Sequence, residues 1–260
     1  MPPIVLVPAA LAVGVLLLPL AALVARVDWS TIVADLTAPE TLDALRLSIV
    51  TGVVATAVCL VLGVPLAIVI ARATPRVAGL LRALVTVPLV LPPMVGGIAL
   101  LFLLGRTGLA GQWLDAAFGL RLPFTTAAVV IAQAFVALPF LVLSVEGTVR
   151  AAGTRYEQVA ATLGASRWTT FRRVTLPLAG PGLVAGTVLC FARAIGEFGA
   201  TALFAGNAEG TTRTMPLAIY TAFNGAGVGQ GTAVALSLLL LVASIAILVL
   251  VRGWRPGSAS

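Results

Sequence analysis

Between two apolar stretches of the chain lies a polar, arginine-rich segment, residues 156–182, with the sequence YEQVAATLGASRWTTFRRVTLPLAGPG. The segment carries Gly164 inside an otherwise helical pattern and reaches Leu176-Pro177, where the next apolar stretch begins. Because glycine adopts left-handed backbone torsions more easily than residues with a side chain, we expect Gly164 to separate two short helices. The segment therefore predicts a polar helix-turn-helix between membrane-spanning helices.

The rest of the chain is mostly apolar. Of its 260 residues, 60% are hydrophobic and 10% are charged, whereas a soluble domain has about 25% charged residues. A helix needs about 20 apolar residues to cross a hydrocarbon core of about 30 Å, and lipid leaves unpaired backbone groups without a partner. We therefore predict an all-α integral membrane protein with six transmembrane helices, near residues 5–25, 47–71, 84–104, 125–145, 177–204 and 232–251.

The third predicted helix contains an unusual number of helix breakers. They are Pro88, Pro92, Pro93, Gly96 and Gly97. Such residues are tolerated in a membrane where neighbouring helices or water satisfy the freed backbone groups. Two interpretations remain open, a kink that serves packing alone and a flexible helix that lines a pore.

The predicted helices divide the chain into three parts. Residues 1–44 form a first helix and an external loop, residues 45–252 form a membrane domain of five helices, and residues 253–260 form a cytoplasmic tail. The first helix could be mistaken for a signal peptide. It has no basic residue before its apolar run, which is also longer than a usual signal sequence, so we expect it to be retained.

The formal charge of +7 comes from arginines that gather in alternate loops. Residues 72–82 hold three arginines and no acid, and residues 150–173 hold five arginines and one glutamate. The intervening loops contain most of the acidic residues. This alternation is typical of the positive-inside rule. It predicts that both termini lie in the cytoplasm, and it accounts for the basic balance without nucleic-acid binding.

Several kinds of chemistry are excluded by composition. The chain has no His, which rules out a His-ligated metal or a His-based catalytic triad. It also has no Lys, so it cannot contain the phosphate-binding loop Gly-x4-Gly-Lys-Ser/Thr. Cys59 and Cys190 both fall in predicted membrane helices, where we expect two small buried side chains rather than a disulfide. We therefore expect a non-catalytic subunit that binds no metal and no cofactor.

The polar segment has its own local signals. Thr154 followed by Glu157 has the spacing of a capping box, which predicts a first helix from Thr154 to Leu163. A second helix is expected from Ser166 to the Pro177 boundary. Small residues on either side of Gly164 would let another backbone approach closely. The alternative is an ordinary basic loop that lies against anionic lipid.

This segment resembles the cytoplasmic signature of the permease subunits of bacterial ABC importers, which reads Glu-Ala-Ala, three residues, Gly, nine residues, Ile-x-Leu-Pro. The chain offers Gln158-Val159-Ala160, Gly164 and Val174-Thr175-Leu176-Pro177 at the same spacing, with Gln and Val replacing the signature's Glu and first Ala. The resemblance implies an ABC importer type I permease fold with coupling helices at residues 154–173, which dock on a separate ATPase subunit. The implied coupling residues are Glu157, Gln158, Ala160, Ala161, Gly164, Ala165, Ser166, Leu176 and Pro177.

Three further stretches resemble the sulfate/molybdate branch of these permeases, and most of all molybdate permeases. They are VPLVLPPMVGGIALLF (87–102), FARAIGEFGATALFAGN (191–207) and TTRTMPLAIY (211–220). The resemblance implies a homodimer with two ATPase subunits, which use ATP and magnesium, and an extracytoplasmic binding protein that selects molybdate. Sulfate, tungstate or a broad range of oxyanions remain as alternative substrates.

Arg193 and Glu197 lie four residues apart in the fifth predicted helix. Because charges inside a membrane usually pair or face water, two hypotheses remain. The two side chains form a structural ion pair, or they line an outer gate at which Arg193 attracts the oxyanion. Hydroxyl donors along the pathway would then come from Thr201, Thr211 and Thr214.

Two other function classes fit the sequence less well. An ion-coupled secondary transporter would show an inverted repeat and acidic residues near the midplane of the membrane. No clear repeat is present, and Glu197 is the only acid deep in a predicted helix. An integral membrane enzyme would need a nucleophile with a base or a metal site, and neither is recognisable.

Overall fold

The computed structural model describes residues 3–225 and 230–253. This part of the chain is helical and contains no strand, which confirms the all-α membrane class. Residues 254–260, most of the predicted tail, lie outside the described residues. The helices are α1 (Pro3–Ala25), α2 (Ile32–Thr37), α3 (Pro39–Arg72), α4 (Pro75–Val90), α5 (Pro93–Leu104), α6 (Gly111–Phe118), α7 (Thr126–Ala152), α8 (Arg155–Thr162), α9 (Arg167–Thr170), the π-helical turn η1 (Phe171–Thr175), α10 (Leu176–Ile195), α11 (Gly199–Phe204), α12 (Met215–Phe223) and α13 (Gln230–Gly253).

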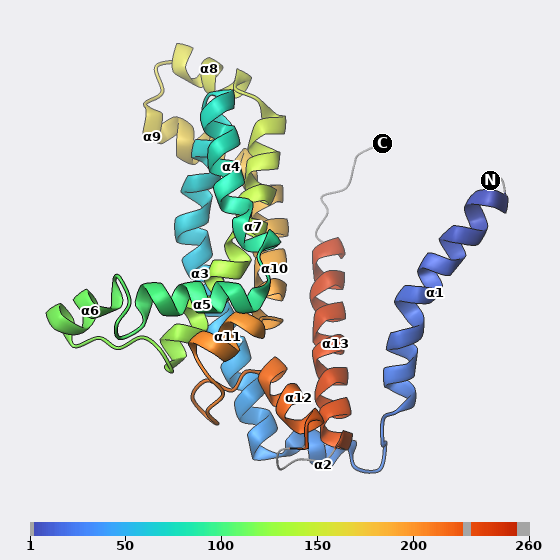
Figure 1. Ribbon diagram of the computed structural model, residues 1–260. Helices are drawn as coiled ribbons and strands as arrows, with labels where there is room; N and C mark the ends of the chain where they lie inside the picture. The colour runs from blue at the N-terminus through green and yellow to red at the C-terminus, as the bar shows by residue number, and fades with distance from the viewer. Residues whose placement is uncertain (1–2, 226–229, 254–260) are drawn as a thin grey trace.

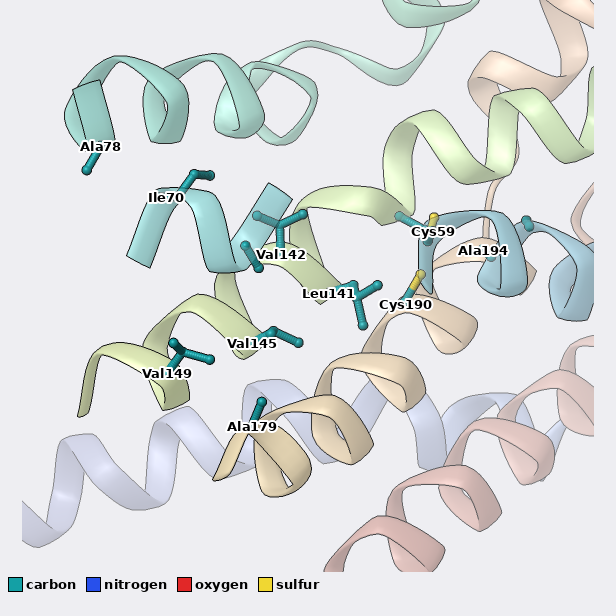
Figure 2. Close-up of a cluster of buried hydrophobic side chains, with 13 residues drawn as sticks. Cys59, Ile70, Ala78, Leu141, Val142, Val145, Val149, Ala179, Cys190 and Ala194 are labelled. Carbon is teal, nitrogen blue, oxygen red and sulfur yellow. The ribbon is translucent and has the colours of Figure 1, made fainter. Parts of the chain in front are cut away.

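The core of the molecule is the bundle of α3, α7 and α10, which run side by side in Figure 1. Small residues bring these helices close together. A side chain at Gly63 of α3 would meet the Leu138 and Leu141 side chains of α7 at 3.0 and 3.1 Å. Figure 2 shows Leu141 of α7 near Cys59 of α3 and Cys190 of α10. Both cysteines are buried and free, which confirms the prediction that they are packed thiols and not a disulfide.

Four helical stretches are long and apolar enough to cross a membrane. They are α1, α3, α7 and the continuous run Arg167–Ile195, and α4 with α5 makes a fifth if the bent pair is counted as one span. The apolar part of α13 with described side chains, Gly231–Ala246, is shorter than a full span. Four of the six predicted membrane helices are thus supported, the third is supported if the bent pair is one span, and the sixth stays a prediction.

The third predicted helix is broken and not merely kinked. α4 ends at Val90, α5 begins at Pro93, and the two helices are bent by 111°. Proline has no backbone N–H and disfavours a helical residue before it, so Leu91 adopts an extended conformation ahead of Pro92-Pro93. α5 then packs across α11, where a side chain at Gly97 would lie 2.9 Å from the Ala200 Cα atom. The predicted helix over 84–104 is therefore not continuous, and its helix breakers mark the position of the break.

The fifth predicted helix was wrong at both ends. It does not begin at Pro177, because α9, η1 and α10 form one helical run. The π-helical turn ends at Thr175, two residues before Pro177, whose ring and missing N–H conflict with regular α-helical bonding. At the other end, α10 stops at Ile195 and α11 starts only at Gly199, so residues 196–198 form a turn inside the predicted span.

The second and fourth predicted helices are longer than expected. α3 has 34 residues and begins at Pro39, so its first turns lie in the stretch that was predicted as an external loop. α7 continues to Ala152, seven residues beyond its predicted end at residue 145. This extension of α7 reaches the polar segment, beside which α3 ends at Arg72.

Candidate functional site

The polar segment folds as two short helices around Gly164, as predicted. Gly164 has a φ angle of +80°, the left-handed conformation that glycine adopts most easily. Its N–H donates to the Ala161 carbonyl and the Ala165 N–H donates to the Ala160 carbonyl, each at 3.0 Å. These two bonds form a Schellman motif that ends α8. The second helix then starts at Ser166, whose hydroxyl accepts from the Thr169 N–H at 3.2 Å.

The predicted capping box at Thr154 and Glu157 is wrong. Thr154 has φ −109° and ψ −3°, outside the extended region typical of a capping residue, and its side chain makes no capping bond.

 Glu157 is instead held by two other groups. Its Oε1 atom lies 2.7 Å from Nη2 of Arg72 and accepts a hydrogen bond from the Thr175 hydroxyl at 2.8 Å. Glu157 therefore faces the bundle and does not cap its own helix.

The residues predicted for coupling divide between two faces of the segment. Glu157, Ala160, Ala165 and Leu176 are half-buried, whereas Gln158, Ala161, Gly164, Ser166 and Pro177 are exposed. Large apolar side chains share the exposed face, namely Tyr156, Val159, Leu163 and Trp168. Apolar side chains gathered on a polar, arginine-rich segment are typical of a protein-binding surface. We call these four residues and their exposed neighbours on α8 and α9 the docking face.

An ion-pair network between α4 and α7 was missed from the sequence. Arg82 of α4 pairs with both carboxylate oxygens of Glu146, and its Nε atom lies 3.2 Å from Oε2. Arg150 adds a contact of 3.3 Å from its Nη1 atom to Oε1 of Glu146. The Glu146 side chain is only 4% exposed, so two arginines compensate one buried carboxylate. The spacing of four between Glu146 and Arg150 was the one signal available in the sequence.

At the other end of α10, Arg193 and Glu197 form the predicted pair. Arg193 Nη2 lies 2.7 Å from Glu197 Oε2, and the Glu197 side chain is 1% exposed. Glu197 lies in the turn after α10, so the prediction that both residues lie within one helix was wrong. Its other oxygen accepts a hydrogen bond from the Ala200 N–H at 2.8 Å, at the start of α11. The carboxylate thus joins α10 to α11.

The three threonines predicted for a pathway lie in different surroundings. Thr201 in α11 and Thr214 before α12 are fully buried, and neither hydroxyl has a hydrogen-bond partner among the described residues. Thr211 is exposed, and its carbonyl accepts from the Thr126 hydroxyl at 2.9 Å. The structure does not bring the three hydroxyls onto one exposed surface.

The membrane bundle with its broken helix and exposed polar segment is matched by a known family of transport proteins. Residues 63–256 match the family model described as "binding-protein-dependent transport system inner membrane component". The chain belongs to this family, and it is a multi-pass membrane protein of the transport-subunit class.

Individual relatives in this comparison are molybdenum and sulfate transport permeases. The chain is 54% identical to the molybdenum transport system permease protein ModB of Mycobacterium tuberculosis, over 83% of this chain and 81% of that protein. It is 41% identical to ModB of Escherichia coli over 72% of this chain and 81% of that protein. It is 37% identical to the sulfate transport system permease protein CysT of Escherichia coli, over 79% of this chain and 75% of that protein.

Solved structures support the fold. A chain of a bacterial alginate ABC transporter, solved in complex with an alginate pentasaccharide-bound periplasmic protein, has a TM-score of 0.68 at 16% identity, covering 96% of this chain and 94% of that chain. A chain of the MetNI methionine ABC transporter in inward-facing conformations has a TM-score of 0.63 at 17% identity, covering 82% of this chain and 94% of that chain. At such low identity the likeness shows the permease fold alone.

Proposed function

We propose that this chain is the permease subunit of an ATP-driven importer and forms the membrane pathway for molybdate. The observation that carries the proposal is the 54% identity to a molybdenum permease over four-fifths of both chains. The sulfate permease is more distant, at 37%. The stretches that suggested the molybdate branch include the break between α4 and α5 and the turn between α10 and α11, where the fold departs most from straight helices.

The docking face is proposed to bind a separate ATPase subunit. Its exposed apolar side chains need a partner outside the membrane, and the segment sits at the end of the bundle away from α2 and α12 (Figure 1). ATP and magnesium act on that partner, because this chain has no lysine for a phosphate-binding loop. The full complex is proposed to contain two copies of this chain, two ATPase subunits and an extracytoplasmic molybdate-binding protein. The alginate transporter, whose structure includes a periplasmic protein, offers a precedent for such an assembly.

The arrangement in the membrane follows from the charges. The arginines of α8, α9 and η1 favour the cytoplasm. In Figure 1 the start of α1 and the end of α13 point toward the same side as α8 and α9, which supports the proposal that both termini are cytoplasmic. Residues 45–252 are proposed as the permease domain, and the family match begins within it at residue 63.

Arg193 is the proposed anion-attracting residue of the pathway. Its side chain is 26% exposed, whereas its partner Glu197 is almost completely buried. The guanidinium can therefore keep one side toward Glu197 and offer its remaining donors to an oxyanion. Thr211 is exposed enough to add a donor in this conformation, whereas Thr201 and Thr214 would need a movement of α11 or α12 to do so.

The test is transport in proteoliposomes that contain this chain, its ATPase subunit and its binding protein. We expect uptake of labelled molybdate that requires ATP and resists a large excess of sulfate. Equal competition by sulfate would move the substrate to sulfate or to a broad class of oxyanions, and competition by tungstate would measure the selectivity between the two larger anions. Uptake driven by a proton gradient without the ATPase subunit would contradict the proposal.

A further inference from the structure

The polar segment, residues 156–182, is called the coupling segment from its proposed role, and its inner face holds an arrangement that neither the signature nor the relatives explain. Glu157 lies beside the signature positions, yet it turns away from the docking face and pairs with Arg72 at the end of α3. We propose that Arg72 and Glu157 form a strut that fixes the docking face to the membrane helices and transmits its movement to them. Arg72 is thus a positioning residue for transport. The inference rests on the proposed function.

The strut joins four helices at one point. Arg72 is the last residue of α3, and its Nη2 atom donates to the Gly153 carbonyl at 2.9 Å, just after α7. Its Nη1 atom lies 3.4 Å from the Val149 carbonyl oxygen, in the last turns of α7. On the other side, Glu157 of α8 accepts from Thr175, at the junction of η1 and α10. The ends of α3 and α7, the body of α8 and the start of α10 are therefore linked through one ion pair.

The partly buried surroundings of Arg72 and Glu157 strengthen the attraction between the two side chains. The two side chains are 24% and 21% exposed, so they are screened less than a surface pair. They line a cavity of about 470 Å³ between the end of α3 and the coupling segment. The cavity leaves the segment without a packed apolar base at this point. A charge-assisted hydrogen bond is the contact that spans the gap.

The coupling segment has little else to hold its position. No residue of α8 or α9 is buried, whereas α3, α7 and α10 have a closed apolar core between them. Loss of the strut should therefore leave the bundle folded and let the docking face move independently of it. Movement of the ATPase subunit would then no longer be transmitted in full to α3 and α10.

The experiment compares Arg72→Gln with two matched variants in the complete complex. Arg72→Lys keeps the charge but cannot reach Glu157 and the Gly153 carbonyl with a planar fork, so it should restore part of the coupling. Arg76→Gln is the control, because Arg76 is an exposed arginine in the first turn of α4, four residues from Arg72, and forms no ion pair within the described residues. The measured quantity is labelled molybdate taken up per ATP hydrolysed, with the ATPase subunits retained in each purified complex.

We expect Arg72→Gln to lower uptake per ATP by about tenfold, within the range in which single substitutions alter coupling between distant sites. Arg72→Lys should fall between Arg72→Gln and wild type, and Arg76→Gln should match wild type. An unchanged ratio for Arg72→Gln would overturn the proposal. Loss of the ATPase subunits from the Arg72→Gln complex would also overturn it, since Arg72 would then serve assembly and not transmission.

A second measurement separates this inference from the proposed function. Hydrogen exchange on the purified chain alone, without substrate or ATPase, reports the strut directly. We expect Arg72→Gln to raise exchange of the α8 amides by about tenfold or more and to leave the buried part of α7 unchanged. Wild-type complexes that fail to transport molybdate would sink the proposed function, whereas equal α8 exchange in wild type and Arg72→Gln would sink the strut.

Discussion

The two ends of the helical run 167–195 each meet a glutamate paired with an arginine, but the two pairs differ in kind. Glu197 and Arg193 are four residues apart, and Glu197 is 1% exposed. Glu157 and Arg72 are 85 residues apart and both remain partly exposed. The Arg193–Glu197 pair closes a local turn inside the protein, and the Arg72–Glu157 pair links distant parts of the chain at the polar segment. We expect the Arg193–Glu197 pair to act on the stability of the fold, and the Arg72–Glu157 pair to act on how the helices that it joins move together.

The largest effect should come from removing Arg193. Arg193→Met leaves the Glu197 carboxylate buried without its partner, which should lower the free energy of unfolding by about 3–5 kcal/mol. Glu197→Gln removes the charge and keeps an oxygen that can accept from the Ala200 N–H, so it should cost less. Thermal unfolding of the detergent-purified chain measures both. If Arg193→Met unfolds at the wild-type temperature, the Arg193–Glu197 pair does not govern stability.

The next effect tests the contact between α7 and α10, on which both ends of the run depend. A Cβ atom at Gly182 would overlap the Thr148 hydroxyl and lie 2.8 Å from the Ser144 carbonyl oxygen. Gly182→Ala should therefore destabilise the chain by about 1–3 kcal/mol. Gly180→Ala in the same helix meets no atom within 4 Å and should be neutral or stabilising by up to about 1 kcal/mol. Equal unfolding temperatures for the two variants would contradict this helix packing.

A smaller effect is expected at the turn of the coupling segment. Nothing lies within 4 Å of a Cβ atom at Gly164, so Gly164→Ala acts through backbone strain at a φ of +80°. The strain of about 1–2 kcal/mol should reduce ATP-dependent uptake several-fold. Gly164→Asn should retain more transport, because asparagine tolerates this conformation better. Transport by Gly164→Ala at or above that of Gly164→Asn would show that the left-handed turn is not what matters.

The smallest effect on stability should come from Glu157→Gln. The amide keeps an acceptor for Thr175, and a partly exposed ion pair contributes only about 0.2–1 kcal/mol. Its unfolding temperature should stay close to wild type while uptake per ATP falls. A loss of stability as large as that of Arg193→Met would erase the difference between the two pairs.

The sequence predicted the features that depend on local chemistry. Gly164 and Ser166 were predicted correctly because a left-handed glycine and a capping serine act on their own neighbours. The breakers of residues 88–97 located the third helix's break but could not give its 111° angle, which depends on packing of α5 against α11. These local features are set by residues that lie close together in the chain.

The features that were missed depend on residues far apart in the chain. The spacing of Thr154 and Glu157 suggested a capping box, but Glu157 pairs instead with an arginine 85 residues away. Arg82 and Glu146 are likewise 64 residues apart. The early end of α10 had a local signal, since Gly196 and Gly199 flank Glu197, but the apolar character of the stretch concealed it. Ion pairs between residues far apart in the chain are decided by the fold, and the local sequence pattern does not predict them.

The length of α3 has a consequence for the end of the bundle at which α2 and α12 lie. Its 34 residues span about 51 Å, and a tilt of about 20° still leaves about 48 Å along the membrane normal. The hydrocarbon core is only about 30 Å thick. Part of α3 therefore stands clear of the lipid tails, and the start of α3 carries α2 and α12 with it (Figure 1). Where these turns rise above the level of the lipids, the chain presents them to water as a raised rim.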